Sequence, residues 1–97
     1  MYTWVIYDIR KNKVRNRVAK RCKFYGLTRV QKSVFLGRLK SKQIKVLNSE
    51  LSNTINQRTD RLFVMPMSNE HFGRILQSGA LPPLASVVND NKLRFFQ

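Results

Sequence analysis

Residues 2–7, YTWVIY, are aromatic or β-branched throughout, and they are apolar on both alternating faces apart from Thr3. Such a pattern predicts an interior strand of a sheet, with both of its sides covered. Residues 61–65, RLFVM, have the same character, and we expect Pro66 to end this second strand. The fold must therefore bring apolar partners to both faces of a small sheet.

Two segments between these strands carry apolar residues at helical spacing. We expect one helix over residues 13–25, capped by Asn12 and ended by Gly26 in a left-handed conformation. A second helix is expected over residues 41–56, with Ser41 as its cap. The predicted buried stripes are Val14, Val18, Cys22 and Tyr25 in the first helix and Ile44, Leu47, Leu51 and Ile55 in the second.

Residues 27–39, LTRVQKSVFLGRL, are extended by composition. They form one strand if Val30 and Val34 lie on one side and Phe35 lies on the other. The polar stretch around Lys32 and Ser33 equally allows two short strands joined by a turn. Periodicity does not decide between these two possibilities.

The C-terminal third is expected to hold a short helix, a loop and a strand. Ser68 can cap the helix and Gly79 can end it. Residues 79–91, with two prolines and several asparagines, predict a loop, and residues 92–96, KLRFF, predict a terminal strand. The apolar residues expected on the short helix are Phe72, Ile75 and Leu76.

This order of elements predicts an α+β sandwich in which two helices lie on one face of the sheet. A length of 97 residues indicates a single domain over 1–97, with its core in 2–67 and the C-terminal helix, loop and strand in 68–97. If both long helices cover one face, the other face is bare and apolar. Monomers rarely expose such a patch, so we expect a homodimer formed through the sheet.

The charge of the chain is strongly one-sided. Lys and Arg number 19 against five Asp and Glu, and residues 9–49 contain fourteen basic side chains and no acidic one. Because such charge repels itself, a polyanionic partner is expected, namely a DNA or RNA backbone read without base specificity. The candidate nucleic-acid-binding residues lie on and before the first helix: Arg10, Lys11, Lys13, Arg15, Arg17, Lys20 and Lys23.

No membrane partner is expected. The sequence contains no unbroken apolar stretch of about 20 residues, the length that a membrane-spanning helix requires. The first residues, MYTWVIYDI, also lack the charged start and apolar core of a signal peptide. These features predict a cytoplasmic protein.

Asp8 follows the first strand directly and is the only acidic residue before Glu50. It could cap the following turn, or form a surface ion pair with a neighbouring cation such as Arg10. It could also bind magnesium, which prefers carboxylate oxygens. One carboxylate makes a poor site, but a twofold axis near the strand end would bring two copies of Asp8 together. The metal would then serve phosphodiester cleavage, with arginines stabilising charge on phosphorus.

Other catalytic groups are not indicated. His71 is the sole histidine and is expected at the surface, and the sole cysteine, Cys22, is expected to be a small buried side chain. Glu50, Asp60 and Glu70 are scattered and are interpreted as surface residues, as is Asp90. Asp8 therefore remains the leading candidate.

The motif VIYDI, followed by VRNRVAKRCKFYGL and RVQKSVFLGRL, resembles the second CRISPR-associated adaptation family. The resemblance covers residues 2–67 and continues more weakly through MSNEHFGRIL into the C-terminal strand. It implies a ferredoxin-like βαββαβ fold, a homodimer, and a CRISPR integrase subunit as partner. It also implies two short strands within residues 28–39, and a terminal strand that adds to the sheet edge of the partner.

The resemblance also implies a site. Asp8 matches the strand-end aspartate that the family associates with a divalent metal, Mg²⁺ or Mn²⁺, and with endonuclease activity at the dimer axis. Members often carry acids after YDI, where this chain has basic residues, and many have Glu where this chain has Leu36. These departures weaken metal catalysis and favour phosphate binding. The other positions linked to nuclease function are Arg15, Arg17, Arg29 and Phe35.

Three functions remain open at this point. The first is a metal-dependent endonuclease for RNA or DNA that acts in spacer acquisition and antiviral defence. The second is a non-catalytic dimeric scaffold that binds duplex DNA within the integrase complex. The third is a toxin-like ribonuclease of similar fold.

Overall fold

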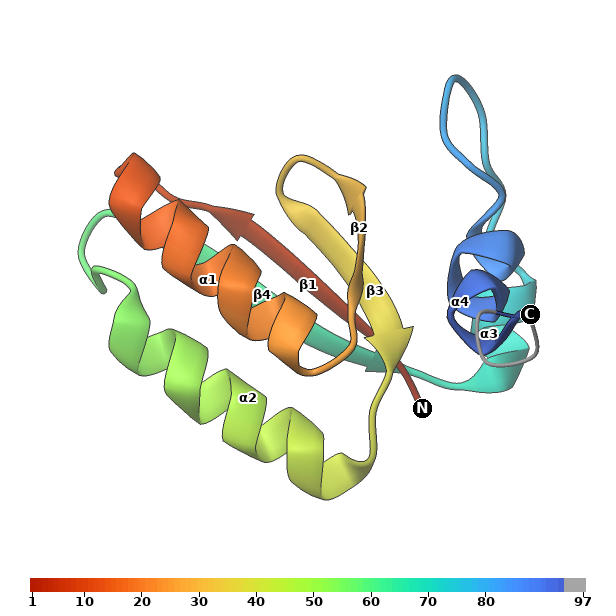
Figure 1. Ribbon diagram of the computed structural model, residues 1–97, viewed down its shortest axis with the longest axis horizontal. Helices are drawn as coiled ribbons and strands as arrows, with labels where there is room; N and C mark the ends of the chain where they lie inside the picture. The colour runs from red at the N-terminus through yellow and green to blue at the C-terminus, as the bar shows by residue number, and fades with distance from the viewer. Residues whose placement is uncertain (94–97) are drawn as a thin grey trace.

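Strands and helices alternate along the part of the chain that the structure describes, which is the backbone of residues 1–93 and the side chains of residues 1–88 of a computed structural model. The elements, coloured in chain order in Figure 1, are β1 (Tyr2–Asp8), α1 (Asn12–Phe24), β2 (Thr28–Gln31), β3 (Val34–Arg38), α2 (Ser41–Thr54), β4 (Arg61–Met67), α3 (Asn69–Gly73) and α4 (Leu84–Leu93).

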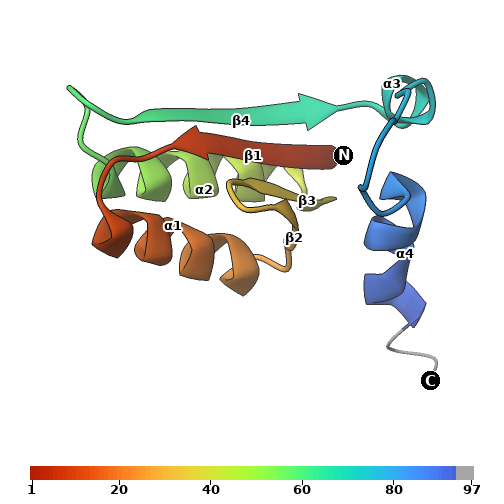
Figure 2. The same ribbon diagram turned by 90° about the horizontal axis from the view of Figure 1, so that it is seen from above.

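The strands form one antiparallel sheet in the order β2-β3-β1-β4. Helices α1 and α2 lie side by side on one face of this sheet (Figures 1 and 2). This is the predicted ferredoxin-like βαββαβ sandwich. The segment whose periodicity was ambiguous is indeed two strands, with the turn at Lys32 and Ser33.

The main core lies between the sheet and the two helices. Val5, Tyr7 and Phe35 extend from the sheet into this core. Residues spaced four apart along α1 and α2 share one face of each helix and pack against them. Cys22 is fully buried there, as predicted, and burial raises the pKa of its thiol to about 12. The helix residues at the centre of the core are Val18, Cys22, Leu47 and Leu51.

The opposite face of the sheet is only partly bare, which corrects the sequence-based expectation. Helices α3 and α4 pack at the end of the sheet where β1 begins (Figure 2), and Leu84 and Val88 bury Leu36 there. The rest of this face stays open, and Phe63 and Met65 of β4 are 59% and 38% exposed. An apolar strip therefore remains uncovered along β1 and β4.

Helix α4 replaces most of the loop that the sequence predicted over residues 79–91. The prolines do not prevent it, because Pro83 directly precedes the first helical residue, where a missing N–H costs nothing. Its carbonyl accepts a hydrogen bond from the Val87 N–H at 3.1 Å. The predicted strand 92–96 is also wrong at its start, since residues 92 and 93 belong to α4, and its remainder lies outside the described residues.

Several helix and strand ends differ from prediction. Lys11 and Lys40, rather than Asn12 and Ser41, are the N-cap residues of α1 and α2. Helix α2 ends at Thr54, and β4 runs through Pro66 because an edge strand tolerates proline. Helix α3 ends before Ile75 and Leu76.

Other predicted ends are confirmed. Ser68 caps α3 by accepting a hydrogen bond from the His71 N–H at 3.1 Å, and His71 is exposed. Gly26 has a φ of +84°, the left-handed conformation expected after α1. None of the described helices has the length and apolar character needed to cross a membrane.

Candidate active site at the end of strand β1

Asp8 is the last residue of β1 and lies opposite Arg61 of β4 in the sheet register. Since Tyr7 is buried under the helices, strand alternation places Asp8 on the other face, in line with Ile6. Asp8 is exposed, and its carboxylate makes no hydrogen bond or ion pair with any backbone or side-chain group that the structure describes. The cap and the ion pair considered from the sequence are therefore absent, and the carboxylate is free for a ligand.

Arg15 lies on the helix side of the same strand end. Its guanidinium donates hydrogen bonds to the carbonyls of Ile9 at 2.6 Å and Arg10 at 3.2 Å, and to the Asn12 side chain. Arg15 is thus fixed against the loop that joins β1 to α1. These bonds leave its positive charge uncompensated, since carbonyl and amide oxygens are neutral acceptors.

A small cavity of about 120 Å³ lies between the first turns of α1 and the β2–β3 hairpin. Burial raises the pKa of the Tyr7 hydroxyl, while the hydrogen bond and charge of Arg29 pull it the other way. A neutral hydroxyl beside three cations offers a donor set for a phosphate group. The residues that line the cavity are Tyr7, Asn12, Arg15, Asn16, Arg29 and Lys32.

Phe35 is fully buried, so its ring does not reach a substrate at the surface. The ring lies beneath Arg29, whose guanidinium carbon is 5.1 Å from the ring centroid, and it stacks on Tyr7 with centroids 6.3 Å apart. The predicted role of Phe35 in catalysis is untested. Its position allows a role through Arg29 and Tyr7 only.

The other predicted residues lie elsewhere. Arg17 is exposed on α1 and lines a separate hollow of about 470 Å³ with Lys20, so the structure does not bring Arg17 to Arg15 and Arg29. Lys13 and Lys23 are exposed on α1. Nucleic-acid binding by any of these side chains remains a prediction.

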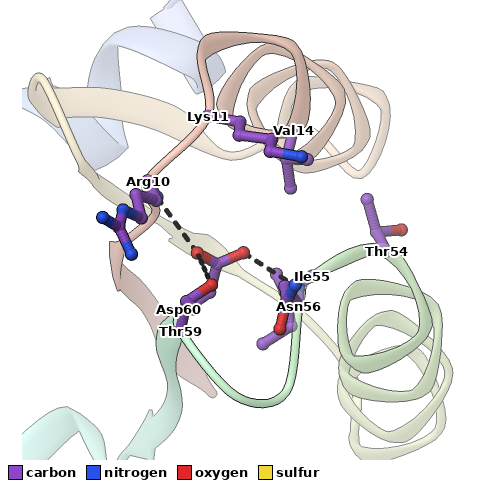
Figure 3. Close-up of a pocket in the computed structure, with 8 residues that line it drawn as sticks. All are labelled: Arg10, Lys11, Val14, Thr54, Ile55, Asn56, Thr59 and Asp60. Atoms are coloured by element: carbon purple, nitrogen blue, oxygen red, sulfur yellow. Dashed lines mark hydrogen bonds between the residues drawn. The ribbon is translucent and has the colours of Figure 1, made fainter.

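Asp60 was interpreted from the sequence as an ordinary surface residue, but it joins two loops. Its carboxylate accepts hydrogen bonds from the N–H groups of Arg10 at 3.0 Å and Asn56 at 2.9 Å, at the base of a cavity of about 450 Å³ (Figure 3). These bonds hold the pKa of Asp60 below its ordinary value of 3.8. Asp60 therefore fixes the loop that carries Arg10 and Lys11.

This carboxylate predicts a stability difference that depends on pH. Because the folded state lowers the pKa of Asp60, its stabilising effect is complete above the unfolded value of 3.8 and is lost as pH falls through the lower folded value. Urea unfolding should find Asp60→Ala less stable than the natural chain at neutral pH and nearly equal to it at the lowest accessible pH. A stability difference between the two chains that stays constant with pH would contradict the stabilising role of the Asp60 carboxylate.

The residues fit a metal ion only in part. Among the described residues, no three His, Cys, Asp or Glu side chains lie close enough together to hold a metal. One protomer supplies one free carboxylate, Asp8, whereas magnesium binds one or two carboxylates together with waters and phosphate oxygens. A second copy of the chain would complete the pair, and the open strip at Ile6 and Phe63 lies beside Asp8 on the same face.

The sequence interpretation missed Tyr7 and Asp60. Tyr7 could have been found, because it directly precedes Asp8 in the motif and its side chain points to the opposite face of the same strand end. Asp60 carried no such signal, because its two partners are backbone groups that only the fold brings together.

Comparisons with known proteins agree with the fold and the motif. The family model described as CRISPR associated protein Cas2 matches residues 1–75. The CRISPR-associated endoribonuclease Cas2 2 of Pyrobaculum aerophilum is 34% identical over 92% of this chain and 98% of its own length. The CRISPR-associated endonuclease Cas1/endonuclease Cas2 fusion of Thermoproteus tenax is 31% identical over 91% of this chain, which spans 33% of that protein.

A solved structure agrees as well. The crystal structure of Streptococcus pyogenes Cas2 at pH 6.5 superposes with a TM-score of 0.70 and 27% identity, over 81% of this chain and 100% of the other. The family resemblance carried by VIYDI and RVQKSVF is thereby confirmed. From its sheet order, its strand-end motif and these matches, the chain belongs to the CRISPR-associated Cas2 family.

Proposed function

We propose that this chain is a metal-dependent endonuclease of CRISPR adaptation that hydrolyses phosphodiester bonds in nucleic acid. The observation that carries the proposal is the free Asp8 carboxylate at the end of β1, while Tyr7 and the Arg15–Arg29 cavity lie at the same strand end on the opposite, helix-covered face of the sheet. The endoribonuclease names of its curated relatives favour RNA as the substrate.

The groups present suit the charges of this reaction. Arg15 and Arg29 can neutralise a phosphate and stabilise the additional negative charge that develops on it during attack by water. Phe35 holds Arg29 in place from below. Asp8, from two protomers, would hold a magnesium or manganese ion, which when bound supplies a Lewis acid and lowers the pKa of a water ligand.

We take the working unit to be a homodimer formed through the open strip of the sheet. In the sheet register, Ile6 lies between Val34 of β3 and Phe63 of β4. Asp8 is two residues beyond Ile6 on the same face, so a twofold axis at the end of this strip would bring the two carboxylates together.

The direct test is a cleavage assay on single-stranded RNA and on duplex DNA. We expect cleavage with Mg²⁺ or Mn²⁺ and none with EDTA, because one protein carboxylate per chain cannot activate water without a metal. Restoring the metal after EDTA should restore the rate. Cleavage of equal rate in EDTA would contradict a metal-dependent site.

A second function, scaffolding in the integrase complex, has its own support. The Thermoproteus tenax relative joins a Cas1 and a Cas2 part in one chain, which favours association with the integrase subunit here as well. The exposed cations of α1 suit a duplex backbone. The two functions are compatible, and the Asp8 variant discussed below separates them.

A further inference from the structure

Two hollows lie along α1 where it borders α2, on the side of α1 away from the Tyr7 cavity. The first is the cavity of about 450 Å³ in Figure 3, where Lys11 of the α1 side faces Thr54 of the α2 side. The second is the hollow of about 470 Å³ that contains Lys20 and Phe24. Thr54 lines both hollows, so we treat them as one α1–α2 groove.

The α1 side of this groove is strongly basic. Arg17, Lys20, Arg21 and Phe24 recur at helical spacing and form one stripe that lines the second hollow. The acidic groups nearby are already engaged, since Glu50 pairs with Arg21 at 3.0 Å and Asp60 accepts backbone hydrogen bonds. Arg17 and Lys20 therefore keep charges that attract an anion.

Phe24 lies in the second hollow, among the cations of the stripe, and is 76% exposed. The Arg21 guanidinium carbon lies 5.2 Å from its centroid, and Tyr25 meets it edge-on with centroids 5.8 Å apart. These contacts hold the ring in place and leave most of it in solvent. A fixed, open aromatic ring among cations is a platform on which a nucleic-acid base can stack.

We propose that the α1–α2 groove binds single-stranded nucleic acid, with one base stacked on Phe24 and the backbone phosphates along Lys20, Arg17 and Lys11. Phe24 favours a single strand because the bases of a duplex are already stacked on one another and cannot cover the ring. The groove follows α1 from Lys11 to Phe24, a length of about 20 Å at 1.5 Å per residue. The proposal builds on nucleic acid as the ligand of the proposed function, but it uses a surface that contains neither Asp8 nor the Tyr7 cavity.

The test is fluorescence anisotropy with the full chain, a labelled oligothymidine and a labelled hairpin duplex with the same number of phosphates. Phe24→Ala should weaken oligothymidine binding by about tenfold, the loss of one stacked base, and should change duplex binding by less than about twofold. Phe24→Tyr keeps a ring and should retain the affinity. Val46→Ala, on α2 and also exposed, is the matched control and should change neither affinity.

The outcomes separate this proposal from the proposed function. Equal weakening of both probes by Phe24→Ala, or no weakening of either, overturns the stacking site while nucleic-acid binding itself stands. Failure of the natural chain to bind either probe at low salt instead overturns nucleic acid as the ligand. Lys20→Gln should weaken both probes and reduce the slope of log affinity against log salt by about one, as expected for a phosphate contact.

Discussion

Replacing Asp8 with asparagine is expected to lower the rate of phosphodiester cleavage by about 100-fold or more. The variant keeps the size and shape of the side chain and removes the negative charge that a divalent metal needs. Folding should be unaffected, because the Asp8 carboxylate is exposed and makes no described hydrogen bond or ion pair. The measurement is single-turnover cleavage of labelled RNA at saturating Mg²⁺, with Glu70→Gln, another exposed acid on α3, as the control.

The same variant distinguishes the two functions. If the chain also acts as a scaffold, Asp8→Asn should still assemble with the integrase subunit and support spacer insertion at a normal rate, since binding to a duplex backbone uses the cations of α1. Undiminished cleavage by Asp8→Asn would contradict the assignment of Asp8. Loss of both cleavage and insertion would mean that the carboxylate serves assembly rather than hydrolysis.

Mixing natural and Asp8→Asn chains tests whether two copies of Asp8 share one metal. When equal amounts are allowed to exchange subunits, about a quarter of the dimers keep both carboxylates. Cleavage should then fall to about a quarter of the rate of the natural chain alone at the same total protein concentration. A fall to one half would mean that each protomer acts alone.

The strand and helix order followed from the sequence because it depends on local apolar spacing. Residues 2–7 and the stripe through Val18 and Cys22 each pack as their periodicity indicates. The split of residues 27–39 did not follow from periodicity and was expected only from the family resemblance, since the turn at Lys32 and Ser33 is defined by the pairing of β3 with β2 and with β1. Local spacing cannot report which distant strand a segment will join.

Helix α4 was missed because Pro82 and Pro83 were taken as evidence for a loop. A proline directly before a helix is favourable, and the spacing of Leu84, Val87 and Val88 was a helical signal within the predicted loop. This helix matters for function, because it covers one end of the sheet face that was expected to be bare. The open strip is therefore confined to the part of the face that runs toward Asp8.

The residues of the site were predicted unevenly. Asp8 could be identified from its isolation in a basic segment. Arg15 was expected from charge to bind nucleic acid, whereas its nuclease role, and Arg29 altogether, came only from the family resemblance. Arg15 lines the Tyr7 cavity and Arg17 does not. Charge could not predict this difference, because it depends on which side of α1 each residue faces. Burial of Phe35 was likewise not evident from alternation, because its neighbour Leu36, on the other face of β3, is buried as well.

Replacing Phe63 with glutamate is expected to weaken dimerisation by about 100-fold or more, because a charge placed in an apolar interface loses its hydration without gaining a partner. The variant chain should fold normally, since Phe63 is 59% exposed in the single protomer. Sedimentation velocity over a range of concentrations measures the change. Val46→Glu, which adds the same charge to another exposed apolar position on α2, should leave the dimer intact.

Cleavage should fall together with dimerisation if the metal site is shared. At concentrations where Phe63→Glu is monomeric, its cleavage rate should match that of Asp8→Asn, although its own Asp8 is unchanged. Raising the protein concentration should restore cleavage in parallel with the dimer, since association returns the second carboxylate. A monomeric Phe63→Glu chain with full activity would show that one Asp8 suffices, and a Phe63→Glu dimer of natural affinity would show that the chains associate through a different surface.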